Sequence, residues 1–184
     1  MTDTLTRAPM LQFPTSILPA LRRALGREHS PADAAALERQ LGFETGEGFY
    51  AALRNRLEDS GADVDTLPAD EFWQRVGDFF ADLGWGTLEF DRLHPGVAAL
   101  SSADWVEADP NVQAAQPSCH FTTGLLADLL GRVAGDDLAV LEVECRCAGD
   151  DRCRFLLGGG DALERVFDAM RQGRSYREAV EQLG

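Results

Sequence analysis

Four cysteines constrain this chain more than any other feature, because three of them fall within nine residues of a predicted hairpin. The segment from residue 138 to 158 reads LAVLEVECRCAGDDRCRFLLG, and Cys145 and Cys153 flank its glycine-containing turn. A turn centred on Gly149 would place these two thiols directly opposite each other on neighbouring strands. Thiols at such a site can form a strained disulfide or chelate one metal ion, and a reducing cytosol favours the metal.

A third thiol comes from Cys119, which begins a predicted helix, where the helix dipole and free backbone amides favour the ionised thiolate. Glu142, Glu144 and His120 are the candidates for a fourth ligand. Three thiolates plus one oxygen or nitrogen match a closed structural zinc site, which would stabilise the fold by joining the helix to the hairpin. The simpler alternative is three buried cysteines that act as small apolar side chains. Cys147 is expected to be a free, partly exposed thiol.

Composition excludes several classes of protein. The chain has 184 residues, 45% of them hydrophobic and 26% charged, which predicts one folded domain. A formal net charge of −14 repels phosphate backbones, so we expect no binding to nucleic acid. The N-terminus lacks a signal-peptide pattern, and no apolar stretch approaches the ~20 residues that span a bilayer. We therefore expect a cytoplasmic protein with no membrane contact.

The first part of the chain, at about residues 15–84, has the apolar spacing of helices. Ser30 and Pro31 match the N-cap and first position of a helix, and Gly42 is expected to break the helical run. Ser60-Gly61 indicates a loop. The predicted helices cover residues 17–25, 31–41, 44–57 and 69–83.

After Gly84 the hydrophobic period changes to that of strands. Residues 86–93 with 96–105, and 138–147 with 152–157, predict two hairpins. A helix at 119–133 lies between them, and helices at 162–170 and 175–183 follow. This order predicts an α+β fold in which helices pack against one antiparallel four-stranded sheet made of two hairpins. The single domain, residues 1–184, then has a helical N-terminal part, a core at about 85–160 and C-terminal helices at 161–184.

Two motifs carry a resemblance to a known family. PSCHFTTGLLADLLG, from Pro117, and VLEVECRCAGDDRCRF, from Val140, resemble the signature of the 4-vinyl-reductase domain family. That family is related in fold to the aromatic-sensing domains of bacterial activators and to TRAPP subunits of Golgi transport. The resemblance therefore implies a fold like that of the NO-signalling and Golgi-transport ligand-binding domains.

The resemblance also implies a set of metal ligands, which fall on Cys119, Glu142, Cys145 and Cys153. Strict strand alternation would place Glu142 and Cys145 on opposite faces, so a β-bulge is expected between them.

A ligand cavity is the next implication. Relatives hold a small hydrophobic molecule between the sheet and the helices, and the candidate lining residues here are Trp105, Phe121, Phe72, Phe79 and Phe90. Phenol sensors of the family hold the phenolic hydroxyl with a His and a Trp. Trp105 is the candidate for that Trp, and the sequence offers no equivalent of the His. The stripe of phenylalanines that includes Phe72 and Phe79 is otherwise explained as helix core.

These observations predict a sensor or carrier domain that binds a small hydrophobic molecule, holds a structural zinc ion, forms a homodimer and acts through a separate partner protein. The alternative is an enzyme or accessory protein in tetrapyrrole vinyl reduction. Such hydride chemistry needs NADPH or a flavin, and the chain has no dinucleotide-binding glycine motif, so no catalytic activity is expected. A dimeric tethering protein is the third possibility.

Overall fold

The computed structural model describes residues 10–11, 13–109 and 111–183. Four strands form one antiparallel sheet in the order β1-β2-β4-β3. The predicted α+β class with two hairpins is therefore confirmed. In chain order the elements are α1 (Ile17–Glu28), α2 (Pro31–Asp59), α3 (Ala69–Asp82), β1 (Glu89–His94), β2 (Val97–Ser102), α4 (His120–Ala134), β3 (Ala139–Glu144), the 3₁₀ turn η1 (Arg146–Ala148), β4 (Cys153–Gly158), α5 (Gly160–Arg171) and α6 (Tyr176–Glu181).

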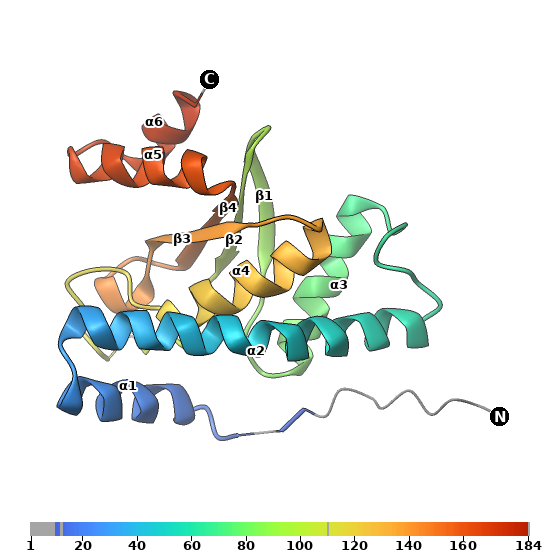
Figure 1. Ribbon diagram of the computed structural model, residues 1–184, viewed down its shortest axis with the longest axis horizontal. Helices are drawn as coiled ribbons and strands as arrows, with labels where there is room; N and C mark the ends of the chain where they lie inside the picture. The colour runs from blue at the N-terminus through green and yellow to red at the C-terminus, as the bar shows by residue number, and fades with distance from the viewer. Residues whose placement is uncertain (1–9, 12, 110, 184) are drawn as a thin grey trace.

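Helices cover both faces of the sheet (Figure 1). On one face α4 packs against β3, the long α2 packs behind α4, and α1 lies along the outer side of α2. On the other face α5 packs against β3 and β4, and α6 packs against α5. The core is accordingly divided into two clusters of buried residues, one on each side of the sheet.

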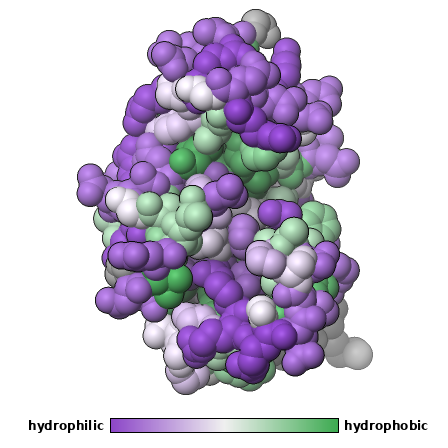
Figure 2. All heavy atoms as spheres, turned by 90° about the vertical axis from the view of Figure 1, so that its left-hand side faces the viewer, coloured by the Kyte–Doolittle hydropathy of each residue, from purple (hydrophilic) through white to green (hydrophobic). Residues whose placement is uncertain are grey.

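The outer surface agrees with the charge of the chain. Figure 2 shows that hydrophilic side chains dominate the face it displays, with apolar side chains gathered in smaller areas between them. Within the part of the chain that the structure describes, no helix is both long enough and apolar enough to cross a membrane.

The helix α2 runs unbroken for 29 residues, so the predicted break at Gly42 is wrong. A Cβ atom on Gly42 would overlap the carbonyl oxygen of Phe121 in α4. Similarly, a Cβ atom on Gly124 of α4 would overlap the carbonyl oxygen of Arg39 in α2. The two helix backbones therefore approach closely because both positions lack side chains. This packing offsets the low helix propensity of glycine.

The start of α2 follows the prediction. The Ser30 hydroxyl accepts a hydrogen bond from the Asp33 amide at 3.2 Å, and Pro31 occupies the first turn. The final helix α6 begins with a capping box, in which Ser175 and Glu178 each accept a hydrogen bond from the other's backbone amide.

The second hairpin differs from a flat ladder centred on Gly149. Glu142 pairs with Phe155, whereas Glu144 pairs with Arg154, so the register shifts by one residue between the two glutamates. This irregularity is the expected β-bulge, placed before Cys145 as the resemblance implied. A bulge rotates the following residues relative to the partner strand, which allows Glu142 and the next cysteine to share a face.

After Glu144 the chain leaves the ladder and turns through η1, and Gly149 ends the turn in the left-handed region with φ of 97°. Cys147 lies inside this turn, is only 3% exposed, and its thiol donates to the carbonyl oxygen of Asp109 at 3.3 Å. The expectation of a partly exposed Cys147 is therefore wrong. The loop before α4 covers it, since the Ala114 amide donates to the Cys147 carbonyl oxygen at 2.8 Å.

Candidate metal centre

The structure brings the four predicted metal ligands together. One ligand atom from each of Cys119, Glu142, Cys145 and Cys153 lies within 4.8 Å of all the others, and all four residues are buried. The Cys119 Sγ lies 3.9 Å from the Cys145 Sγ and 3.8 Å from the Cys153 Sγ. Tetrahedral zinc, with Zn–S bonds of about 2.3 Å, separates its sulfur ligands by about 3.8 Å. The thiol spacing therefore fits one metal ion.

Each ligand is positioned by a different local feature. Cys119 is the N-cap residue of α4, and its side chain caps no helix amide, so its sulfur is free to face the sheet. Glu142 lies on β3 beside the bulge, and Cys145 follows the end of that strand. Cys153 is the first residue of β4. The cluster thus joins α4 to both strands of the second hairpin.

Glu142 has one paired oxygen and one unpaired oxygen. Its Oε2 accepts a hydrogen bond from the Cys119 amide at 2.7 Å. Its Oε1 is buried and has no hydrogen-bond partner among the described residues. Burial raises the pKa of Glu142 to about 9, and the neighbouring Cys145 thiolate adds to the effect. An orphaned carboxylate oxygen beside three thiols is the donor that a metal ion would complete.

The thiols are electrostatically unequal without a metal. Hydrogen bonds from Cys119 and Cys153 hold the pKa of Cys145 far below its usual range. Hydrogen bonding to Cys145 and Cys153, together with burial, raises the pKa of Cys119. One thiolate therefore accepts hydrogen bonds from its neighbours, and a metal ion would replace those protons because metal ligands are deprotonated cysteines.

Glu107 is a buried residue at this site that the sequence did not indicate. Its carboxylate is 1% exposed and accepts hydrogen bonds from the amides of Phe121 and Thr122, at 3.0 and 2.8 Å, and from the Thr122 hydroxyl. It therefore caps the first turn of α4 in place of Cys119. Burial raises the pKa of Glu107 to about 7, against the opposing effect of these hydrogen bonds. The available signal was a carboxylate close to Trp105, which no motif linked to the helix start.

The five aromatic residues predicted to line a cavity occur together between the sheet and the helices of the α4 face. Trp105 is fully buried, and its indole N–H donates to the Thr122 hydroxyl at 2.7 Å. Phe72, Phe79 and Phe121 are buried in the same cluster, and Phe90 packs against it through a stacked contact with Trp73.

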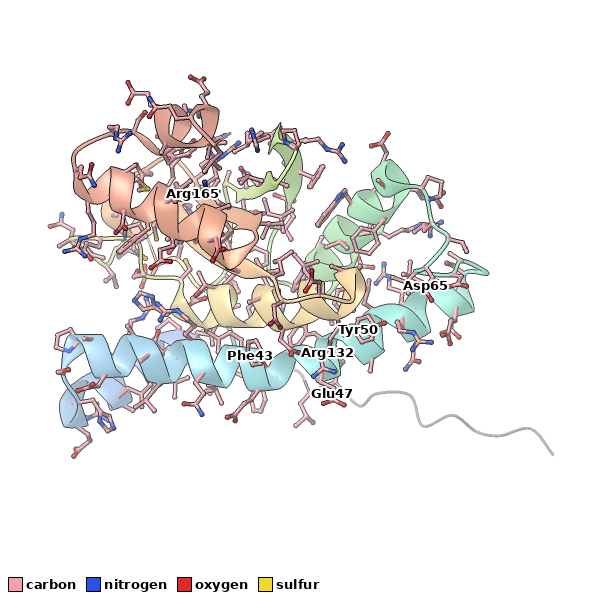
Figure 3. All side chains as sticks on the ribbon, turned by 45° about the horizontal axis from the view of Figure 1, so that its top comes forward. Phe43, Glu47, Tyr50, Asp65, Arg132 and Arg165 are labelled. Atoms are coloured by element: carbon pink, nitrogen blue, oxygen red, sulfur yellow. The ribbon has the colours of Figure 1, made fainter. Side chains whose placement is uncertain are left out.

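An open hollow of about 620 Å³ lies elsewhere, between α2, α4 and the loop that follows α4. Figure 3 shows Phe43, Glu47 and Arg132 at this junction of the two helices. Arg132 pairs with Asp128 at 2.7 Å and with Glu47 at 3.5 Å, so two carboxylates balance its charge. None of the five predicted pocket aromatics lines this hollow.

The segment that carries the metal ligands is also the segment that matches a known family. Residues 102–158 match the vinyl-4-reductase domain. The match includes Cys119, Glu142, Cys145 and Cys153 and covers less than a third of the chain. The resemblance to the 4-vinyl-reductase domain family is thereby confirmed.

A curated relative supports this domain match over a limited length. The uncharacterized protein MJ0745 from Methanocaldococcus jannaschii is 30% identical over 77 residues, which are 42% of this chain and 41% of the relative. The alignment therefore spans less than half of the relative's length.

Two solved structures share the fold. The phenol-responsive sensory domain of the transcription activator PoxR, solved with phenol, aligns with a TM-score of 0.64 and 19% identity over 89% of this chain and 81% of that domain. A trafficking protein particle complex subunit 3 from Naegleria fowleri, covalently bound to palmitic acid, aligns with a TM-score of 0.57 and 10% identity. That alignment covers 78% of this chain and 91% of the subunit.

Proposed function

We propose that this chain is a sensor or carrier domain that binds a small hydrophobic molecule and is held in shape by a structural zinc ion. The unpaired Oε1 of Glu142, buried among three thiols, is the observation that carries the zinc site. The vinyl-4-reductase domain match and the fold shared with a phenol-responsive sensory domain support the sensing role.

Cys119, Glu142, Cys145 and Cys153 would hold the zinc ion. Three thiolates and one carboxylate fill a tetrahedral shell, so zinc bound here would have a structural role and would stabilise the fold. The residues themselves connect the start of α4 to β3 and β4. Zinc suits this donor set because it accepts both thiolate and carboxylate ligands and does not change its oxidation state.

We assign the hydrophobic ligand to the aromatic cluster on the α4 face, with Trp105, Phe121, Phe72, Phe79 and Phe90 as the contacting residues. The indole N–H of Trp105 already donates to Thr122, whose hydroxyl donates to Glu107. Since these polar groups are paired with one another, the ligand that fits this cluster makes mainly apolar contacts. A homodimer and a separate partner protein that receives the signal complete the proposal.

Elemental analysis with native mass spectrometry tests the zinc site on protein purified without added metal. We expect about one zinc ion per chain in the wild type and in Cys147→Ser, and none in Cys145→Ser. Cys147 is the matched control because it is another buried cysteine in the same turn. Finding no metal in the wild type would remove the zinc site from the proposal.

Solvent extraction of the same protein, followed by mass spectrometry, tests the ligand. An apolar small molecule is expected in the extract of the wild type and should be depleted in Trp105→Ala. A protein that carries none, and that shows no change in tryptophan fluorescence with a panel of apolar ligands, would contradict the sensing role.

A dimeric tethering protein is the second candidate function. The close packing of the aromatic cluster favours it, since the ring of Trp105 lies 5.5 Å from Phe80 and 5.7 Å from Trp85. Light scattering coupled to size-exclusion chromatography distinguishes the two functions when combined with the extraction. A stable dimer with no bound molecule supports tethering, whereas a bound molecule supports sensing.

A further inference from the structure

The helix α1 contributes little apolar surface to the core. All twelve of its residues are described, and none of them is buried. Leu18 packs against the edge of the larger core cluster. Figure 1 shows α1 on the outer side of α2, on the far side from the sheet. Polar contacts must therefore account for much of the attachment of α1.

Arg22 makes those contacts. Its Nε and Nη2 both donate to Glu38 Oε2 of α2 at 3.3 Å. Its Nη2 also donates to Glu107 Oε1 at 3.0 Å and to the carbonyl oxygen of Ser118 at 2.5 Å. The side chains of Glu38 and Glu107 are only 4% and 1% exposed. Buried carboxylates need a cationic partner, so Arg22 is the tie that holds α1 in place.

The partners of Arg22 lead directly to the metal centre. Ser118 precedes Cys119 in the chain, and Glu107 caps the first turn of α4 through the amides of Phe121 and Thr122. The sulfur of Cys119 faces Cys145 and Cys153 and caps nothing. The start of α4 is therefore held by the thiol cluster on one side and by Glu107 and Arg22 on the other.

We propose that Arg22 couples the docking of α1 to the state of the cluster formed by Cys119, Glu142, Cys145 and Cys153. This inference rests on the proposed metal site. A filled cluster fixes the backbone of Ser118 and Cys119 where Arg22 can reach it. A cluster without metal frees that backbone, Arg22 loses an acceptor, and α1 separates from α2.

Undocking of α1 changes the surface that a partner meets. Leu37 and Leu41 of α2 are already 37% and 39% exposed, and α1 packs along the same helix. Release of α1 therefore enlarges an apolar face on α2. Because energetic coupling is reciprocal, an undocked α1 must also weaken metal retention by the same factor.

Hydrogen exchange measured by mass spectrometry tests the tie. We expect the amides of α1 to exchange about fivefold faster or more in Arg22→Gln, with β4 unchanged, the lower end of typical coupling. Arg23→Gln is the matched control because Arg23 is the next residue of α1 and is exposed. Equal exchange in the two variants would overturn the role of Arg22.

Chelation tests the coupling. Removing metal from the wild type should raise α1 exchange to the level of Arg22→Gln and should change that variant little further. In return, Arg22→Gln should release zinc to a chromophoric chelator about fivefold faster or more than Arg23→Gln. Unchanged α1 exchange after verified loss of zinc would overturn the coupling and leave the zinc site standing.

Two further variants keep the outcomes separate. A wild type that binds no zinc would defeat the metal site, and Cys119→Ala then perturbs the cluster instead, where unchanged α1 exchange overturns the coupling. Should Arg22→Gln also loosen β4, Arg22→Lys replaces it, since lysine keeps a cation beside Glu38 and Glu107 but lacks the fork that reaches Ser118. Faster α1 exchange in Arg22→Lys supports the tie, and wild-type exchange overturns it.

Discussion

The two faces of the sheet are buried by different chemistry. Beneath α5 and α6 the core is largely aliphatic, with Val97, Leu156 and Val166 among its members. The core on the α4 side includes four cysteines and several aromatic rings, and the buried carboxylates of Glu142 and Glu107 lie beside it. The same sheet therefore has one face that is complete by apolar packing and one that needs polar partners.

The unpaired polar atoms show the contrast. Arg154, on the same side of β4 as Leu156, leaves its Nε unpaired, but its terminal nitrogens donate to Ser101 and Asp91 at 2.8 Å each. The Asp91 carboxylate is 57% exposed, so this pair reaches solvent. The unpaired Oε1 of Glu142 lies among buried thiols instead. The difference teaches that the α4 face depends on an added atom for its stability.

The largest effect should follow loss of a thiol on the α4 face. Cys153→Ser is expected to lower the free energy of unfolding by more than about 4 kcal/mol, because it removes a ligand of the proposed metal ion. Cys147→Ser should cost only about 1 kcal/mol, since Cys147 is not among the four ligands. Urea denaturation of both variants measures the difference. Equal losses would break the contrast between the two faces.

An aliphatic truncation on the other face should cost less and leave the metal in place. Leu156 is fully buried, so Leu156→Ala should lower the free energy of unfolding by about 3–4 kcal/mol through the cavity it creates. Adding a chelator should then destabilise this variant by the same amount as the wild type, because the sites are independent. A smaller effect of the chelator would show that the two faces are coupled.

The close contact between α2 and α4 supports the metal side and should be sensitive to one methyl group. Gly42→Ala is expected to lower the free energy of unfolding by about 3 kcal/mol, because the added Cβ meets the backbone of α4. Gly48→Ala, on the same helix with open space around it, should instead stabilise by about 0.5–1 kcal/mol. Thermal melts of both variants test the opposite signs, and a loss in both would contradict the packing argument.

The faces should also differ in their dependence on pH. The pKa of Glu107 is raised from 4.5 to about 7, so its contribution to stability is complete below pH 4.5 and is lost as pH rises through 7. From pH 5 to 7 this loss should be roughly 2 kcal/mol, and Glu107→Gln should abolish it.

Glu144, at the α6 side, should behave in the opposite way. Burial opposes the shift, but hydrogen bonds from Arg152 and Tyr176 outweigh it and lower the pKa of Glu144 below 4.5. Its contribution is present above pH 4.5 and is lost as pH falls through the lowered pKa, so Glu144→Gln should reduce the acid sensitivity. Urea denaturation across the pH range separates the two residues. A Glu107→Gln profile that keeps the wild-type slope would contradict the assignment.

Much of the fold could be predicted from the sequence because its signals are local. The apolar period marked the helices that became α3 and α4, and Ser30 and Pro31 marked the start of α2. The alternating segments around the two turns became two antiparallel hairpins. Cys119, Glu142, Cys145 and Cys153 were selected from motifs in the chain, and the resemblance indicated the bulge before Cys145.

Other features depended on contacts between distant parts of the chain. Gly42 was expected to end a helix, and the approach of α4 made it part of a continuous one. Cys147 was expected to be exposed, and the loop before α4 buried it. Arg22 and Glu107, separated by 85 positions, met beside the metal centre without any spacing rule that could pair them.

The sequence by itself therefore determined the order of helices and strands and the set of residues able to hold a metal ion, since both follow from local period and residue chemistry. The tertiary structure alone decided how the two helices approach, which thiol is covered and which carboxylate caps α4. Those outcomes depend on burial and on long-range geometry, which have no short-range pattern in the chain.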